Sequence, residues 1–137
     1  MSVSTPFSIP VRVYYRDTDA GGVVYHANYL AFMEAARMEL LEAAGIDVVG
    51  LAEAGESLFM VYSIDIKYHK PARLNDLLSV TVRTTHLGRV RMEFDQRVLR
   101  GGDELVTAAV HAVCVHPRSL KPIAVPAAVR EKLERYR

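Results

Sequence analysis

Hydrophobic and polar positions along the chain follow two periods, one typical of strands and one typical of a helix. Apolar and polar residues alternate in Val11–Tyr15, directly after Pro10, which predicts a first strand. From Asn28 onward the apolar spacing changes to steps of three and four, and Gly45 offers a natural stop. One amphipathic helix of roughly four to five turns is therefore predicted, with Asn28 as its N-cap. Its apolar stripe consists of Tyr29, Met33, Ala36, Leu40 and Ala44.

Four further strand patterns follow this helix, after a connection over residues 47–55 that is irregular or helical. The first three patterns, at Met60–Tyr68, Leu78–His86 and Val90–Asp95, alternate apolar and polar positions. The last, Leu105–Val115, is apolar on both faces. We therefore expect the helix to cover one face of this strand and a second subunit to cover the other.

The order of these elements predicts an α+β fold. A strand, one long helix and four consecutive strands form a largely antiparallel five-stranded sheet with the helix packed on it. A short polar helix is expected near Val129–Tyr136, after a tail broken by prolines. The chain has 137 residues, which is the size of one ordinary domain, so residues 1–137 are expected to form a single domain.

Composition and charge narrow the range of partners. A net charge of +1 disfavours nucleic acid or an anionic membrane surface as a partner. No apolar run approaches the ~20 residues that a membrane span needs, and the polar start at Met1–Thr5 lacks a signal-type core, so we expect a cytoplasmic location. The single cysteine, Cys114, excludes an internal disulfide and a multi-cysteine metal site, and no metal is expected.

The densest group of reactive side chains lies in residues 15–29, between the first strand and the helix. This segment holds two carboxylates, two glycines, a histidine and three tyrosines. Glycines let a ligand approach the backbone, and the helix N-terminus offers unpaired N–H groups to an oxyanion. A carboxylate near such a site acts as base or nucleophile toward a carbonyl. The same residue types are ordinary turn formers, and spacing alone favours that structural interpretation.

Residues 17–29, Asp-Thr-Asp-Ala-Gly-Gly-Val-Val-Tyr-His-Ala-Asn-Tyr, resemble the signature of the 4-hydroxybenzoyl-CoA thioesterase group of hotdog-fold enzymes. The likeness continues through Phe32 and Glu34–Arg37, and extends to residues 68–76 and 93–96. It is greatest with the branch of short acyl-CoA thioesterases associated with the Tol–Pal system. The resemblance implies a hotdog fold, in agreement with the order of the predicted elements.

The resemblance also implies roles for individual residues. Asp19 matches the catalytic carboxylate, and Asp17, two positions earlier, is the competing candidate. Only one of the two carboxylates is expected to serve the carbonyl. The thioester carbonyl is directed at the backbone amide of His26, whose imidazole orients water or polarises the carbonyl. Further substrate contacts are expected from Gly21, Gly22 and Tyr25.

Two arginines beside the Gly88 turn are candidates for binding the phosphates of CoA. Arg89 and Arg91 have guanidinium groups that suit phosphate oxygens. As bases of a hairpin turn they are also expected to be solvated, and that alternative stays open.

These features predict an enzyme that hydrolyses acyl-CoA thioesters, with short aliphatic or aromatic acyl groups, to free acid and CoA. Asp19 either attacks the carbonyl to form a mixed anhydride or activates the water that does. No cofactor is expected, because CoA, or an acyl carrier protein, enters as part of the substrate. The alternatives are a hotdog hydratase or dehydratase and a non-catalytic acyl-CoA-binding subunit. Hotdog relatives pair sheets edge to edge, so we expect a homo-oligomer, a dimer or a tetramer, with the tetramer favoured.

Overall fold

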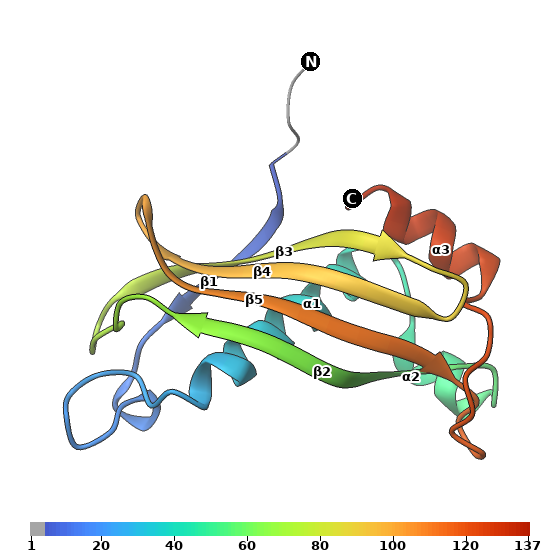
Figure 1. Cartoon of the computed structure of the whole chain (residues 1–137), viewed down its shortest axis with the longest axis horizontal. Helices are drawn as coiled ribbons and strands as arrows, with labels where there is room; N and C mark the ends of the chain where they lie inside the picture. The colour runs from blue at the N-terminus through green and yellow to red at the C-terminus, as the bar shows by residue number, and fades with distance from the viewer. Residues whose placement is uncertain (1–4) are drawn as a thin grey trace.

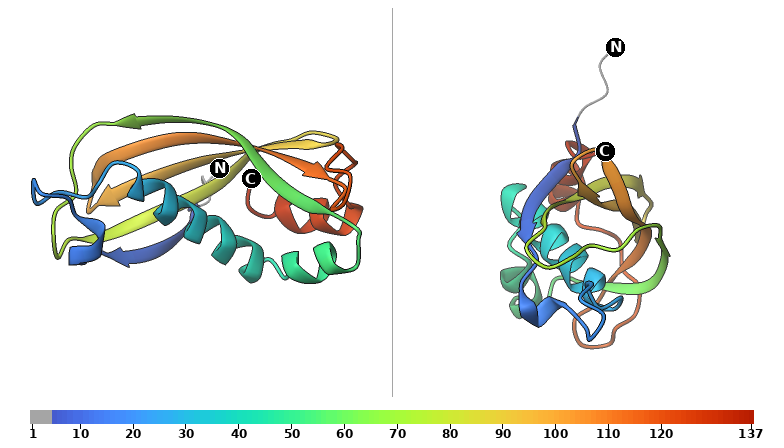
Figure 2. Two further views of the ribbon diagram at one scale, coloured as in Figure 1. Left: turned by 90° about the horizontal axis from the view of Figure 1, so that it is seen from below. Right: turned by 90° about the vertical axis from the view of Figure 1, so that its left-hand side faces the viewer.

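A curved sheet wraps around one central helix in the computed structural model, which describes residues 5–137 (Figures 1 and 2). The sheet has five strands in the order β1-β3-β4-β5-β2, and every neighbouring pair is antiparallel. The predicted α+β class and the antiparallel five-stranded sheet are confirmed. The strands are β1 (Phe7–Arg12), β2 (Leu58–Tyr68), β3 (Leu77–Leu87), β4 (Arg91–Arg100) and β5 (Asp103–Val115).

Helix α1 (Asn28–Ala43) lies against the concave face of the sheet (Figure 2). Its 16 residues span about 24 Å. The five residues of the predicted apolar stripe, Tyr29 to Ala44, are all buried, with exposed fractions of 9% or less. Gly45 follows with a φ of +78°, the left-handed conformation that commonly ends a helix. The predicted stripe and stop are therefore confirmed.

The first strand lies earlier in the chain than predicted. The prediction of a strand at Val11–Tyr15 is wrong, because β1 ends at Arg12. There the chain leaves the sheet: the N–H of Val13 donates to the carbonyl of Asp76 at 2.9 Å, and a short 3-10 turn follows. Pro10 lies inside β1, where it is tolerated because β1 is an edge strand.

The remaining elements lie close to their predicted positions. Helix α2 (Val48–Glu53) occupies the connection predicted to be irregular or helical, and α3 (Ala127–Glu134) is the short polar helix near the end of the chain. Strand β4 runs to Arg100, five residues beyond its predicted end at Asp95. On β5 the side chains facing away from α1 are half-buried, and their coverage by a second subunit stays a prediction.

The described residues include no helix that is long and apolar enough to cross a membrane. Within the same range, no three side chains of His, Cys, Asp or Glu are grouped in a way that would hold a metal ion. Cys114 is fully buried in β5. The polar start at Met1–Ser4 lies outside the described residues.

Candidate active site

A tight turn over residues 18–24 projects from the molecule just before α1 (Figure 1). Thr18 and Val24 form an antiparallel bridge that closes it. Inside the turn, the N–H of Asp19 donates to the carbonyl of Val23 at 2.9 Å, and the N–H of Gly22 returns to the carbonyl of Asp19 at 3.1 Å. Gly22 has a φ of +77°, which explains why a glycine occupies this position. The turn thus presents Asp19 on a short, hydrogen-bonded loop.

The Asp17 carboxylate joins this turn to the start of α1. Asp17 is 7% exposed. One carboxylate oxygen accepts the N–H of Tyr14 at 2.8 Å, and the other accepts the side-chain amide of Asn28 at 2.7 Å. Asn28 is consequently the first residue of the helix, and Ala27 occupies the N-cap position without a capping side chain. The predicted N-cap at Asn28 is therefore wrong.

The Asp19 carboxylate, in contrast, is exposed. One of its oxygens accepts the N–H of Gly21 at 2.8 Å, and the other makes no hydrogen bond within the described part of the chain. One oxygen of Asp19 is thus free to meet an incoming group, whereas both oxygens of Asp17 are occupied. This difference favours Asp19 over Asp17 as the reactive carboxylate.

Two backbone N–H groups at the start of α1, those of His26 and Ala27, have no acceptor among residues 5–137. The next one, from Asn28, donates to the carbonyl of Tyr25 at 2.8 Å. Unpaired N–H groups at a helix N-terminus carry partial positive charge and bind anions or developing oxyanions. The structure therefore leaves the His26 amide, which the sequence analysis names, and also the Ala27 amide without an acceptor in the described part of the chain.

The side chains of Tyr25 and His26 lie at the surface beside these amides. Their rings are in contact, with centroids 4.7 Å apart. The ring of His26 also approaches Tyr68 edge-on, at 6.2 Å. No hydrogen bond joins the imidazole of His26 to the carboxylate of Asp19 within the described chain.

Tyr29 anchors the helix start in the core. It is 3% exposed, and its hydroxyl oxygen accepts the N–H of Ala72 at 3.0 Å. Its ring packs against those of Phe32 and Tyr68, at 6.0 and 5.7 Å. Burial raises the pKa of Tyr29, so its hydroxyl stays neutral at ordinary pH. Tyr29 therefore has a structural role.

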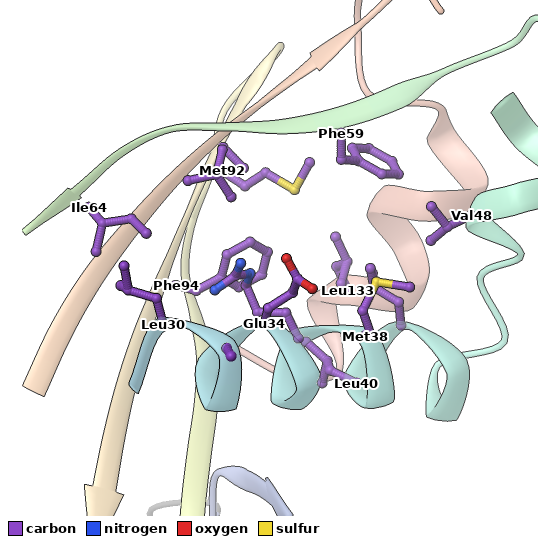
Figure 3. A pocket seen from close by; sticks show the side chains of 15 residues that line it. Leu30, Glu34, Met38, Leu40, Val48, Phe59, Ile64, Met92, Phe94 and Leu133 are labelled. Carbon is purple, nitrogen blue, oxygen red and sulfur yellow. The ribbon is translucent and has the colours of Figure 1, made fainter. Parts of the chain in front are cut away.

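An apolar cavity of about 610 Å³ begins roughly one helical turn beyond His26 (Figure 3). Figure 3 shows Leu30 extending from α1 toward Ile64 on β2, and Glu34 pointing from α1 into the space between the helix and β2. No local signal in the sequence points to this cavity, because its walls come from three helices, α1, α2 and α3, and from three strands, β2, β4 and β5. Its other apolar lining includes Val61, Ile64, Met92, Phe94 and Ala112.

One polar contact lies in the wall of this cavity. The Arg37 guanidinium donates to the side-chain oxygen of Gln96 at 2.8 Å, and Gln96 is fully buried. The Gln96 amide nitrogen in turn donates to the carbonyl of Met33 at 3.0 Å. Burial lowers the pKa of Arg37. These bonds tie the middle of α1 to β4.

Arg89 and Arg91 lie at the opposite end of the sheet from Asp19, at the turn between β3 and β4 (Figure 1). Arg91 stacks on the ring of Tyr62, 5.5 Å from its centroid. Arg89 is exposed. Within one chain the structure does not bring these two arginines together with Asp19 and His26. Their contact with CoA stays a prediction that requires a second chain.

Comparison with known proteins identifies the class of protein to which this chain belongs. The family model of the thioesterase superfamily matches residues 21–107, and the chain belongs to this superfamily. The acyl-CoA thioester hydrolase YbgC of Escherichia coli O6:H1 is 42% identical over 127 residues, which cover 92% of this chain and 94% of the relative. The predicted membership of a thioesterase family is therefore confirmed.

Solved structures of thioesterases have the same fold. A probable thioesterase from Bartonella henselae superposes with a TM-score of 0.83 at 35% identity, over 89% of this chain and all of that one. A 1,4-dihydroxy-2-naphthoyl-CoA thioesterase from Synechocystis superposes with a TM-score of 0.87 at 23% identity, over 94% and 96% of the two chains, and so shares the fold. These neighbours confirm the predicted hotdog fold. The family match begins after Asp19, so the role of that residue rests on the geometry of its turn.

Proposed function

We propose that the protein hydrolyses acyl-CoA thioesters to a free acid and CoA. One observation supports this proposal most directly. Asp19 has a carboxylate oxygen without a hydrogen bond in the described chain, and its turn leads directly to the amides of His26 and Ala27, which have no acceptor there. The likeness to an acyl-CoA thioester hydrolase at 42% identity supports this substrate class. Acyl carrier protein thioesters present the same carbonyl and are the alternative carrier. A cytoplasmic location stays a prediction.

In the proposed mechanism, the thioester carbonyl oxygen accepts hydrogen bonds from the helix-terminal amides, which stabilise the oxyanion as it forms. Losing one such donor typically costs roughly 3 kcal/mol of barrier. Asp19 attacks the carbonyl carbon, CoA leaves as the thiolate, and water hydrolyses the mixed anhydride. In the second route, Asp19 removes a proton from the attacking water. The imidazole of His26 orients that water or polarises the carbonyl, and neither route needs a cofactor.

The apolar cavity beside α1 is the proposed site of the acyl group. Leu30, at its near end, lies four residues beyond His26, so an acyl chain whose carbonyl is held by the amides enters the cavity after about one helical turn. Burying apolar acyl surface against Phe59 and Phe94 supplies binding energy. Short aliphatic and aromatic acyl groups are the expected substrates.

Two other functions are compatible with the same fold. A hydratase or dehydratase needs an acid and a base on either side of the acyl β-carbon, and the turn offers a single free carboxylate, Asp19. A non-catalytic acyl-CoA-binding subunit needs no free carboxylate beside the carbonyl site, so the position of Asp19 would have no purpose in it. Hydrolysis is therefore favoured over both.

The experiment that separates these functions is a product screen over acyl-CoA esters from acetyl to palmitoyl, with benzoyl-CoA included. Thiol release measures hydrolysis, and a change in enoyl absorbance measures hydration. Release of CoA from one group of esters supports the proposal. Hydration without thiol release, or binding without either product, would replace it.

Strand β2 gives a structural reason to expect a homo-oligomer. It is an edge strand of 11 residues with exposed apolar side chains at Met60, Val61 and Tyr62. An open edge of this kind is a template for pairing with another chain. Antiparallel pairing of two β2 strands would bring the Arg91 end of one chain toward the Tyr68 end of its partner. It would thereby bring the predicted CoA-binding arginines close to a catalytic turn.

We predict a dimer or a tetramer, with the tetramer favoured. Sedimentation equilibrium at micromolar concentration should give a mass of at least two chains. A single species with the mass of one chain would contradict the prediction and would also remove the proposed role of Arg89 and Arg91.

The two glycines of the turn should respond differently to an added methyl group. In Gly21→Ala the new Cβ lies 3.2 Å from a carboxylate oxygen of Asp19, so it displaces that group and should lower kcat at nearly unchanged stability. In Gly22→Ala the Cβ meets nothing within 4 Å, but the φ of +77° is strained for alanine and should cost about 1 kcal/mol of stability.

Steady-state thiol release and thermal unfolding, measured on both glycine variants, test this pair. A raised KM in Gly22→Ala at normal stability would show instead that the substrate lies against the Gly22 backbone. Equal loss of stability in both variants would contradict the distinction between them.

A further inference from the structure

We infer that Tyr68 is a positioning residue for the oxyanion site, acting through the peptide bond between His26 and Ala27. This inference rests on the proposed hydrolysis. Tyr68 is the last residue of β2, and its hydroxyl donates a hydrogen bond of 2.9 Å to the carbonyl oxygen of His26. A side chain from the sheet, 42 positions away in sequence, thus holds the backbone at the start of α1.

The carbonyl of His26 depends on this hydroxyl because the helix does not use it. In a regular helical turn it would accept the N–H of Leu30, four residues later. Here the N–H of Leu30 donates to the carbonyl of Ala27 at 3.1 Å instead. The first turn is therefore tightened, and the Tyr68 hydroxyl is the hydrogen-bond donor that the structure gives to the His26 carbonyl.

Holding this carbonyl also directs an amide. The peptide unit is planar, so the direction of the His26 carbonyl fixes the direction of the Ala27 N–H on its opposite side. Among the described residues, that N–H has no acceptor, and the same is true of the N–H of His26. Tyr68 therefore determines where one of the proposed oxyanion donors points, without touching the substrate.

The second donor is held in a different way. The N–H of His26 and the carbonyl of Tyr25 belong to the same peptide bond. That carbonyl accepts the N–H of Asn28 at 2.8 Å. A backbone hydrogen bond therefore fixes the direction of the His26 amide, whereas the direction of the Ala27 amide depends on the side chain of Tyr68. Removing the Tyr68 hydroxyl should therefore weaken one of the two donors and leave the other in place.

The ring of Tyr68 is supported independently of its hydroxyl. It packs against Tyr29 at 5.7 Å and against the edge of His26 at 6.2 Å. Phenylalanine keeps these ring contacts. Tyr68 is also 46% exposed, so loss of the hydroxyl leaves no polar group stranded in the core. Tyr68→Phe thus removes the hydrogen bond to the carbonyl and little else.

The test compares Tyr68→Phe with Tyr136→Phe, a matched loss of one tyrosine hydroxyl near the end of the chain. Tyr68→Phe should lower kcat for thiol release about 10-fold, the effect of one weakened hydrogen bond in the transition state. KM should stay within about 2-fold, because an interaction that strengthens in the transition state affects kcat rather than ground-state binding. The melting temperature should match that of the wild type, and Tyr136→Phe should keep the wild-type kcat.

Each other outcome overturns the inference. Unchanged kcat in Tyr68→Phe shows that the Ala27 amide is held without the hydroxyl. A raised KM at normal kcat makes Tyr68 a substrate contact, and a parallel loss of kcat and melting temperature makes it a structural residue. If the wild-type protein releases no thiol from any acyl-CoA, the proposed function itself fails, whereas the other three outcomes leave hydrolysis intact.

Discussion

Asp19→Asn should lower kcat for thioester hydrolysis by at least ~10²-fold, the lower range for losing a positioned base or nucleophile. Asparagine keeps the size of the side chain and an oxygen that accepts the Gly21 N–H, so the turn stays folded. Only the negative charge is removed. KM should change little, because the helix-terminal amides and the acyl cavity remain. Steady-state thiol release measures both constants.

The matched control is Asp17→Asn, which removes a charge two positions away. In that variant the Asn28 side chain can turn its amide, so that both hydrogen bonds of residue 17 are kept in altered form. We expect a folded protein with turnover much closer to the wild type. A folded but inactive Asp17→Asn beside an active Asp19→Asn would reverse the assignment, and two active variants would disprove catalysis by a carboxylate.

Asp17→Ala should lower the free energy of unfolding by about 3 kcal/mol, more than any of the glycine, tyrosine or Asp19 substitutions. Alanine leaves the partly buried N–H of Tyr14 and the amide of Asn28 without their charged acceptor. The start of α1 loses its connection to the turn, so kcat should fall together with stability. Thermal unfolding should shift downward by roughly 10 °C.

Asp19→Ala is the control for this prediction, because the hydrogen bond that the structure gives to the exposed carboxylate of Asp19 lies within its own turn. Its melting temperature should change by a small fraction of that shift. All variants need the same protein concentration, since the unfolding temperature of an oligomer depends on it. A melting temperature of Asp17→Ala within about 2 °C of the wild type would show that the turn holds without Asp17.

The elements that were predicted correctly depend on local patterns. The steps of three and four from Tyr29 to Ala44 define a helix face without reference to the rest of the chain, and every residue of that stripe is buried. Two of the errors depend on contacts that lie outside the local pattern. The end of β1 is determined by Asp76, and the first residue of α1 by the carboxylate of Asp17. Neither contact has a signal in the spacing of residues.

The candidate site, too, could be predicted only where its residues are close together in sequence. The turn with Asp19 and the helix start at His26 are adjacent in sequence, so one motif predicts both. The choice between Asp19 and Asp17 required the structure, since their spacing alone does not show which carboxylate is already bonded. Tyr68 and the strand residues that line the cavity reach the site from positions far along the chain. No periodic pattern predicts that approach.

The burial of Cys114 bears on how the chemical route can be distinguished. Burial raises the pKa of its thiol, and the thiolate is the form that reacts with disulfide reagents. A chromogenic disulfide added to the native protein should therefore report the CoA thiol with little background from the chain. A rapid first release of one CoA per chain, followed by slower turnover, would then indicate an accumulating anhydride on Asp19. Because the single cysteine is buried and reacts slowly, CoA release in the first turnover can be followed directly by absorbance.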